Sequence, residues 1–347
     1  MINILCCVPQ PVDATSFYRA VGPFAKLRRD FSEVSLIFTH KVDWTVVKMS
    51  DIVFMQRPFR EADVQVAEMA KRWRRPVWVD YDDDLLSVPP ENPTHAIYGR
   101  KQAMECVAKC IALADHVTVS TGFLKDRITK ELPSGAALNE NVTVIPNAFD
   151  DDSFPMEPME GELRRLVVWR GSTTHVKDLW EKRDAFVRLA KRRRDWAWCF
   201  IGYNPWFITE AMPPNSCVSY PAMDIMEYMW TLREKVMPAV IAVPLTDNEF
   251  NKSKSNIAMI EAAWAGATCL GPDWKEWSVP GAVLYDPSRF GSFMEMLDEL
   301  MDHGPEWLRR NALENTWKHV TSTLTLTGSN EVRMNVIRGL VDGKRHP

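Results

Sequence analysis

Short apolar segments alternate with longer amphipathic segments along most of the chain. Two segments, 17–29 and 61–74, place apolar side chains at helical spacing, and the first has Thr15 or Ser16 as its expected N-cap. Apolar runs of the length of buried strands lie before, between and after them, at residues 2–8, 34–38, 52–55, 76–80, 117–120 and 142–146. This alternation predicts parallel strands joined by helical crossovers, which is the pattern of an α/β fold.

The alternation is interrupted once and then begins again. Residues 150–162 are acidic, contain proline and have no periodicity, as is typical of a linker. We therefore predict a Rossmann-like domain at 1–148, a linker at 149–162, a second Rossmann-like domain at 163–320 and a tail at 321–347. Two facing domains of this kind bind a nucleotide in the cleft outside the carboxyl ends of their strands.

Composition narrows the class of protein. The 347 residues suffice for two domains, and the net charge of −4 disfavours a protein that holds nucleic acid by charge alone. No apolar run reaches the roughly 18 residues of a membrane span, and the apolar start at 1–8 is shorter than a signal peptide, so we expect none. The seven cysteines are scattered, as in proteins of a reducing compartment. These features predict a cytoplasmic protein without a membrane span.

The segment FNKSKSNIAMIEAAWAGATCLG, residues 250–271, carries the most specific chemistry. A polar loop precedes a helix, and Glu261 stands on that helix. Free amides at a helix start, hydroxyl groups and a lysine can hold a diphosphate, while a carboxylate further along can accept the hydroxyls of a ribose. The alternative is a solvated loop that caps an ordinary helix. The loop residues are Asn251, Lys252, Ser253, Lys254, Ser255 and Asn256.

This segment resembles the donor site of retaining GT-B glycosyltransferases of family four. It is closest to a bacteriophage-encoded subgroup in which an N-x-x-K-S-N loop precedes the glutamate. Three further stretches agree in order: VWVDYDDDLLSVPP at 77–90, VIPNAFD at 144–150, where Ala148 replaces the usual glycine, and VVWRGSTTHVKD at 167–178. The resemblance implies a GT-B fold with two Rossmann-like domains facing across a cleft, and a helix near 330–341 that returns to the first domain.

The resemblance also implies roles for individual donor-site residues. Glu261 would hold the nucleotide ribose, and Lys254 with Ser255 the diphosphate, with Asn251 and Asn256 in the same loop. Arg170, Gly171, Ser172 and Lys177 would form the opposite wall, although the spacing of Arg170 and Lys177 departs from the commonest family pattern. Arg170 and Lys254 would be catalytic, because cations stabilise the charge on a departing diphosphate.

Four other residues have two interpretations each. His175 lies in the same loop as Arg170 and is either a phosphate donor or a surface residue. Tyr220 follows a strand and either stacks on the base or packs in the core. Tyr18 and Arg19, on the first helix, either contact the acceptor or serve as core and surface residues respectively.

The acidic turn at Asp80–Asp84 has three interpretations. It is a solvated turn or helix cap, with Asp82 or Asp83 as N-cap. Alternatively, it binds a divalent metal, as D-x-D signatures do in the other large glycosyltransferase fold. In the third, Asp83 faces the cleft as a catalytic residue that binds sugar hydroxyls or stabilises the reacting centre. Many family members have a histidine near this position, and this chain does not.

The implied reaction is sugar transfer from a nucleoside diphosphate sugar, a UDP-sugar first among them, to an acceptor hydroxyl with retention and no strict need for metal. The acceptor is either a hydroxymethylated pyrimidine of phage DNA, in the host cytoplasm, or a surface polysaccharide or lipid-linked sugar. A basic run at 182–194 is either a solvated helix face or a phosphate-tracking patch. A non-catalytic nucleotide-binding protein and a sugar-nucleotide epimerase remain as alternatives.

Overall fold

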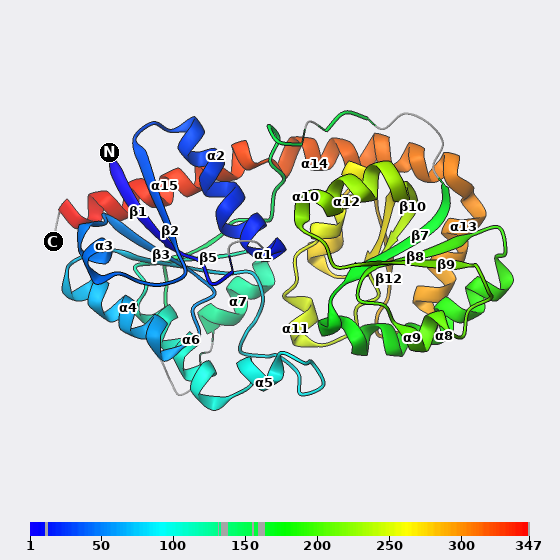
Figure 1. Ribbon diagram of the computed structural model, residues 1–347, viewed down its shortest axis with the longest axis horizontal. Helices are drawn as coiled ribbons and strands as arrows, with labels where there is room; N and C mark the ends of the chain where they lie inside the picture. Colours follow the sequence, from blue (N-terminus) through cyan, green and yellow to red (C-terminus); the bar gives the residue numbers. More distant parts are fainter. Residues whose placement is uncertain (11–12, 131, 133–137, 155, 159–163, 346–347) are drawn as a thin grey trace.

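The computed structural model describes residues 1–347 except 11–12, 131, 133–137, 155, 159–163 and 346–347. The described chain forms two six-stranded sheets, each with helices on both faces (Figure 1). Neighbouring strands pair in parallel in both sheets. The predicted α/β fold is therefore confirmed, and the buried central strands explain the continuous apolar runs in the sequence.

The first sheet has the strand order β2-β1-β3-β4-β5-β6. Its strands are β1 (Ile2–Cys7), β2 (Val34–Thr39), β3 (Ile52–Gln56), β4 (Val77–Tyr81), β5 (His116–Val119) and β6 (Val142–Val144). One face is covered by α2 (Gly22–Asp30) and α15 (Leu326–Arg345). The other face is covered by α3 (Trp44–Met49), α4 (Glu61–Arg72), α6 (Lys101–Leu113) and α7 (Gly122–Lys130), and the short α5 (His95–Tyr98) precedes α6.

The second sheet has the order β12-β11-β10-β7-β8-β9. Its strands are β7 (Arg164–Gly171), β8 (Ala197–Gly202), β9 (Cys217–Pro221), β10 (Pro238–Ala242), β11 (Thr268–Pro272) and β12 (Ala282–Tyr285). One face packs against α8 (Val176–Arg192), α9 (Trp206–Thr209) and α13 (Ser292–Asn311). The other packs against α10 (Ile225–Trp230), η4 (Thr231–Val236), α12 (Ile257–Ala265) and α14 (Lys318–Thr323). Short helical segments η3 (Thr173–His175), α11 (Glu249–Lys252), η5 (Lys275–Trp277) and η6 (Ala312–Trp317) complete this half.

The first helical segment begins earlier than its apolar spacing suggests. Helix α1 (Ala14–Ser16) continues into the π-helix η1 (Phe17–Val21) and then into α2. The expectation of Thr15 or Ser16 as N-cap is wrong, because the Asp13 side chain accepts the hydrogen bond from the Ser16 amide at 2.6 Å. A carboxylate at this position is also stabilised by the positive end of the helix dipole.

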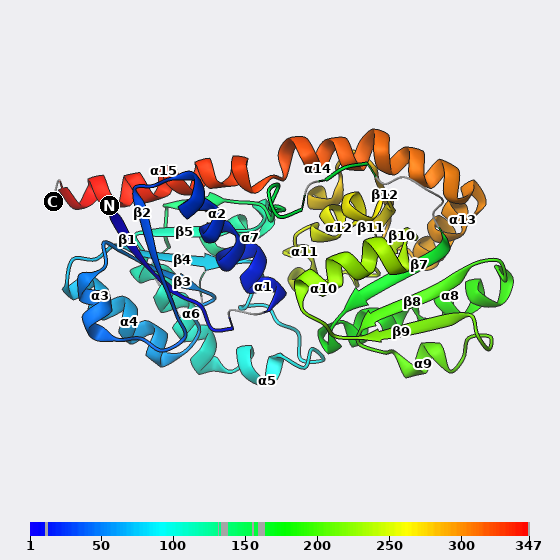
Figure 2. The ribbon, with the colours of Figure 1, turned by 45° about the horizontal axis from the view of Figure 1, so that its top comes forward.

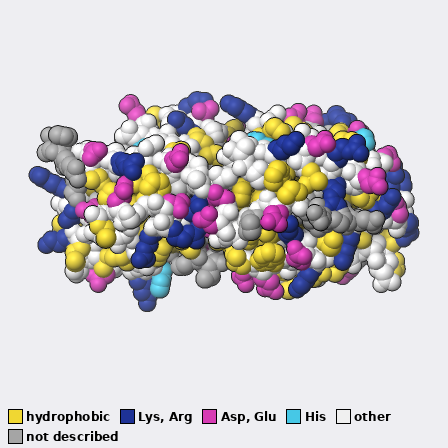
Figure 3. Space-filling view, turned by 90° about the horizontal axis from the view of Figure 1, so that it is seen from above, with side chains coloured by type: hydrophobic (Ala, Val, Ile, Leu, Met, Phe, Trp, Pro, Cys, Tyr) yellow, Lys and Arg dark blue, Asp and Glu magenta, His cyan; other side chains and the backbone are white. Residues whose placement is uncertain are grey.

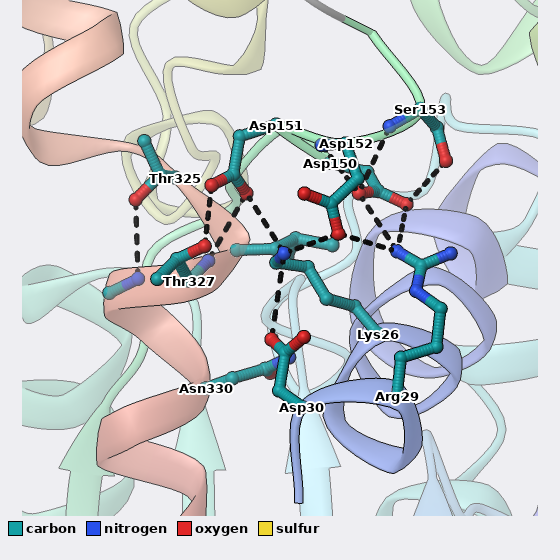
Figure 4. Close-up of polar contacts among 12 residues, drawn as sticks. Lys26, Arg29, Asp30, Asp150, Asp151, Asp152, Ser153, Thr325, Thr327 and Asn330 are labelled. Atoms are coloured by element: carbon teal, nitrogen blue, oxygen red, sulfur yellow. Dashed lines mark hydrogen bonds and ion pairs between the residues drawn. The ribbon is translucent and has the colours of Figure 1, made fainter.

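The chain passes between the two halves twice, and the two passages lie side by side. Phe149 pairs with Thr325 in a parallel β-bridge. Figure 4 shows the linker aspartates facing α2 and the start of α15. Lys26, whose side chain is almost fully buried, donates to Asp152 at 2.6 Å, and Arg29 contacts Asp150 at 3.3 Å. These contacts fix the linker against the first half of the molecule.

Helix α15 runs along the first half, although the helices directly before it belong to the second (Figure 2). Met334, Ile337 and Leu340 on α15 pack into the same cluster as Ile4, and the Asn330 amide donates to the Pro23 carbonyl at 2.9 Å. Among the helices that the structure describes, none is both long and apolar enough to cross a membrane.

Candidate active site

A cleft of about 590 Å³ lies between the two halves. It is built from residues at or just beyond the carboxyl ends of parallel strands, because those ends of both sheets face it. The first half contributes Tyr18, Arg19, Arg57, Asp82, Asp83 and Asn147, among others. The second contributes, among others, Arg170, Gly171, Ser172, His175, Lys254, Ser255 and Glu261. The location agrees with the position expected for a nucleotide ligand in facing α/β domains.

Arg170 and Glu261 form an ion pair at the floor of the cleft. Strand β7 presents Arg170 at its carboxyl end, α12 presents Glu261, and the Arg170 Nε donates to the Glu261 Oε2 at 2.6 Å. Burial raises the pKa of Glu261, and the guanidinium of Arg170 counteracts part of that rise. The structure therefore brings together a carboxylate and a cation that sequence reasoning placed on opposite walls.

The turn after β7 allows a close backbone approach. A Cβ atom on Gly171 would lie 2.8 Å from the Trp169 ring and 3.1 Å from the His175 ring, so only glycine fits without a shift. Ser172 caps the next helical turn by accepting from the Thr174 amide at 3.3 Å. This turn exposes backbone beside the cleft, as a phosphate-binding wall requires.

His175 is oriented by a buried carboxylate. Its Nδ1 lies 2.8 Å from Asp178 Oδ2, and its side chain also borders the cleft. Burial opposes ionisation of Asp178, but hydrogen bonds from His175 and Thr246 outweigh it and lower the Asp178 pKa. His175 is thus a positioned cleft residue and not a free surface side chain.

The loop before α12 faces the cleft through Lys254 and Ser255. The Lys254 ammonium lies 4.4 Å from the centre of the Phe250 ring and 3.2 Å from Asp83 of the first half. The Ser255 hydroxyl accepts from the Asn147 amide at 2.7 Å. Contacts between the two halves therefore hold this loop in place.

The acidic turn after β4 is paired with cations. Arg57 follows β3 with a left-handed φ of 48°, and its guanidinium lies 2.7 Å from Asp82 and 2.5 Å from Asp83. Asp80 pairs with Arg19, and Asp84 with Arg127, and both carboxylates are buried. The solvated-turn and N-cap interpretations are wrong, because each of its carboxylates from Asp80 to Asp84 pairs with an arginine and no described helix begins at this turn.

The two cleft carboxylates of that turn differ in acidity. Burial raises the pKa of Asp82 to about 6, although Arg57 opposes the rise. Burial acts in the same direction on Asp83, but Lys254 and Arg57 outweigh it and hold the pKa of Asp83 at about 2. Asp83 is therefore a carboxylate anion near neutral pH. Among the described residues, no group of three or more His, Cys, Asp or Glu side chains has the geometry of a metal site.

Four predicted donor-site residues do not border the cleft in the structure. Lys177 points along α8 and pairs with Glu181 at 3.0 Å. The Asn251 amide is buried and donates to Asp178 at 2.8 Å, whereas that of Asn256 donates to the Glu276 carbonyl at 2.9 Å. Tyr220 lies on the edge strand β9 and packs against the hydrophobic cluster between the second sheet and α10 and α12, which agrees with its alternative interpretation.

The two predicted acceptor contacts differ in their environment. Arg19 is fully buried and not the surface residue of its alternative interpretation, and its donors are engaged by Asp80, the Ile145 carbonyl and Asn147. It therefore shapes the cleft wall and has little capacity left for a ligand. Tyr18 is also buried, and its hydroxyl lies 3.9 Å from the Met229 sulfur of the second half.

Arg57 and Asn147 are cleft residues that sequence reasoning did not single out. Arg57 is the second residue after the predicted strand at 52–55, and Asn147 directly follows the predicted strand at 142–146, where a parallel strand opens towards a ligand. Asn147 lies within the VIPNAFD segment. The polar residue after each strand was therefore the signal that could have found them.

Part of the basic run at 182–194 is compensated by acidic partners on α13. Arg193 contacts Asp298 at 2.7 Å and Asp302 at 2.6 Å on α13, and Arg192 also pairs with Asp298. Figure 3 shows the side of the molecule that carries α14 and α15, where basic and acidic side chains are interspersed among the described residues. These observations favour the solvated-face interpretation of the run.

Glu276, next to the cleft residue Trp277, is expected to make stability pH-dependent. Burial raises its pKa from 4.5 to about 7. A carboxyl group that binds its proton more tightly when folded stabilises the protein below pH 4.5, and that contribution is lost as the pH rises through 7. Between pH 4.5 and about 7, the melting temperature of wild type should therefore fall relative to that of Glu276→Gln. A difference in melting temperature that does not change with pH would contradict the prediction.

The fold resembles that of known glycosyltransferases. No protein-family model and no curated protein matches the chain. The structure of Anabaena HepE in complex with UDP and glucose superposes with a TM-score of 0.65 at 13% identity, over 98% of this chain and 100% of that one. A Rickettsia africae glycosyltransferase gives 0.64 at 11% identity, over 98% of both chains. A UDP-forming trehalose-phosphate synthase of Burkholderia vietnamiensis gives 0.56 at 12%, over 86% of this chain and 78% of that one.

These similarities define the class of fold. Two facing α/β domains, each with a six-stranded parallel sheet, form the GT-B fold, and the chain spans it from end to end. The predicted fold class is therefore confirmed.

Proposed function

We propose that this protein is a glycosyltransferase that transfers a sugar from a UDP-sugar to an acceptor hydroxyl in the cleft. The observation that carries the proposal is the group of Arg170, Gly171, Lys254 and Glu261 around one cavity. It offers a ribose acceptor, a close backbone approach and two cations in the arrangement that a nucleoside diphosphate needs. The HepE structure, which has the same fold, contains UDP.

The reaction follows from what these side chains do. Glu261 accepts hydrogen bonds from the ribose, while Lys254 and the start of α12 hold the diphosphate. As the bond between sugar and phosphate breaks, negative charge grows on the diphosphate, and the fixed cations stabilise it. We propose retention of the anomeric configuration, in which the departing phosphate takes the acceptor proton. Asp83 then faces the donor sugar from the opposite side of the cleft.

For the acceptor, the described surface favours a glycan hydroxyl over a hydroxymethylated pyrimidine of DNA. A protein that tracks a phosphate backbone needs uncompensated basic side chains near its site. Arg192 and Arg193 are instead paired with carboxylates of α13. If the protein transferred sugar to oligonucleotides that contain the modified base, the preference for a glycan acceptor would be wrong, and DNA would have to bind without this basic run.

A ligand-binding screen tests the proposal. The full chain is melted with UDP, GDP, ADP and CMP, without added metal. UDP is expected to raise the melting temperature, because a ligand that binds only the folded state stabilises it by mass action. Absence of a shift with every nucleotide, in a sample that melts cooperatively, would overturn the nucleotide-binding function itself.

Glu261→Ala is expected to weaken UDP binding by about 1–3 kcal/mol, because the ribose hydroxyls lose a charged partner. Titration calorimetry measures the loss. The UDP affinity of Glu261→Gln, which keeps one acceptor oxygen, should lie between those of Glu261→Ala and wild type. The matched control is Glu181→Ala, since Glu181 pairs with Lys177 away from the cleft. Equal affinities of Glu261→Ala and wild type would remove Glu261 from the ribose site.

A further inference from the structure

The lysine and arginine side chains that line the cleft already have carboxylate partners. Arg170 pairs with Glu261, Arg19 with Asp80, Arg57 with Asp82 and Asp83, and Lys254 with Asp83. A diphosphate that enters this lining meets cations whose charge is compensated. Direct contact with one of them therefore requires that a carboxylate give way.

Asp83 is the carboxylate best placed to give way. Its side chain is 21% exposed, compared with 4% for Glu261 and 3% for Asp80. It has cation partners in both halves, Arg57 at 2.5 Å in its own and Lys254 at 3.2 Å in the other. If the contact with Lys254 breaks, Arg57 still compensates the charge of Asp83. Displacement of Asp80 would instead leave the buried Arg19 without its carboxylate, and displacement of Glu261 would leave a buried carboxylate without Arg170, which costs more in both cases.

The Lys254 loop is itself held by the first half, so the exchange does not need the loop to move. The Thr121 hydroxyl donates to the Ser253 carbonyl at 2.9 Å, and the Asp84 amide donates to the Ser253 hydroxyl at 3.2 Å. The Asn147 amide holds Ser255 in the same way. The residues on either side of Lys254 are thus anchored, and its ammonium has one carboxylate partner in the described structure, Asp83.

We propose that Asp83 occupies, in the free protein, the place on Lys254 that the donor diphosphate takes, and that Arg57 retains the displaced carboxylate in the cleft. This inference rests on the proposed function. Asp83 acts as an internal competitor for the diphosphate before binding. After the exchange it becomes an anion beside the donor sugar, positioned by Arg57, which is a positioning residue for the reaction.

The test measures the UDP affinity of the full chain by titration calorimetry. Asp83→Asn removes the competing charge and is expected to bind UDP about tenfold more tightly, which corresponds to about 1.4 kcal/mol. In a Lys254→Met background the same substitution should change the affinity by less than about twofold, because the ammonium for which Asp83 and the diphosphate compete is absent. Asp82→Asn is the matched control, since Asp82 contacts Arg57 but not Lys254, and it should bind UDP as wild type does.

The outcomes separate this exchange from the proposed function. Wild type that binds UDP, together with Asp83→Asn that binds it equally or more weakly, overturns the exchange and leaves the function standing. Equal tightening by Asp82→Asn also overturns it, because the effect would then be general electrostatics. If no variant binds any nucleotide of the screen, the proposed function fails, and the exchange fails with it.

A second variant gives an independent readout with the opposite sign. Arg57→Met leaves Lys254 as the cation partner of Asp83, so UDP should bind about three- to tenfold more weakly than to wild type. Addition of Asp83→Asn to this variant should restore the affinity. Weakening that persists in the double variant would contradict the exchange, since a merely structural role of Arg57 would not be suppressed by loss of the carboxylate.

Discussion

Replacement of Lys254 by methionine is expected to lower donor turnover by about 100- to 1,000-fold, with the fold intact. The Lys254 ammonium lies in the cleft against the Phe250 ring, and its side chain is 16% exposed. In this partly dry environment, a fixed cation stabilises the departing diphosphate more strongly than water does. Methionine fills the same space over Phe250, and Arg57 remains as a partner for Asp83, so the loss should fall on the reaction and not on folding.

The measurement is the rate of UDP release from the UDP-sugar whose nucleotide is selected in the binding screen. Lys177→Met is the matched control, because Lys177 was predicted for the same phosphate site but pairs with Glu181 on the surface of α8. Its turnover should stay within about twofold of wild type, in keeping with the small effect of an exposed ion pair. Equal losses in the two variants would show that the position of Lys254 in the cleft has no catalytic consequence.

The fold was predictable because its signal is local. The strands Ile52–Gln56 and Val77–Tyr81, which are apolar except for Gln56 and Asp80, are buried on both faces in the structure, and this requires a parallel sheet covered on both sides. The edge strand Cys217–Pro221 was not predicted. It lies at the edge of the described sheet and is partly exposed, so its sequence, CVSYP, lacks the continuous apolar run by which the buried strands were found.

The candidate site was most predictable where a residue's position along an element decides its direction. Glu261 on α12 and Arg170 at the end of β7 satisfy this condition, and the structure places both at the cleft. Asn251 and Asn256 stand in the same loop as Lys254 but turn into the protein, because buried partners such as Asp178 attract their amides. Loop direction depends on such tertiary partners, which no local pattern contains.

Pairing across the cleft was beyond sequence reasoning for a related reason. Arg57 and Asp83 are far apart along the chain, and Asp83 and Lys254 belong to different halves. The acidic turn therefore resembled a solvated segment when its residues were considered alone. Cations from both halves change its chemistry from a self-repelling cluster to a set of compensated anions.

Asp80 is the residue on which the stability of the first half should depend most strongly. Its carboxylate accepts from the Arg19 guanidinium at 3.0 and 2.7 Å and from the Thr118 hydroxyl at 2.6 Å. Arg333 of α15 is also buried, and it donates hydrogen bonds to neutral oxygens of Ser329 and Asn330. Burial and, to a smaller extent, the charge of Arg19 lower the pKa of Arg333, Asp80 opposes them, and the resulting pKa is about 9.

Asp80→Asn should therefore lower the free energy of unfolding by about 3–5 kcal/mol, because it leaves two buried guanidinium groups facing a neutral side chain. Arg19→Met should cost less than Asp80→Asn, since Arg333 still compensates part of the carboxylate charge. Urea unfolding followed by tryptophan fluorescence measures both, with Arg28→Met on the exposed face of α2 as a control that stays within about 0.5 kcal/mol of wild type. A larger loss for Arg19→Met than for Asp80→Asn would show that Arg333 does not share the charge of Asp80, and that this charge does not help to attach α15 to the first half.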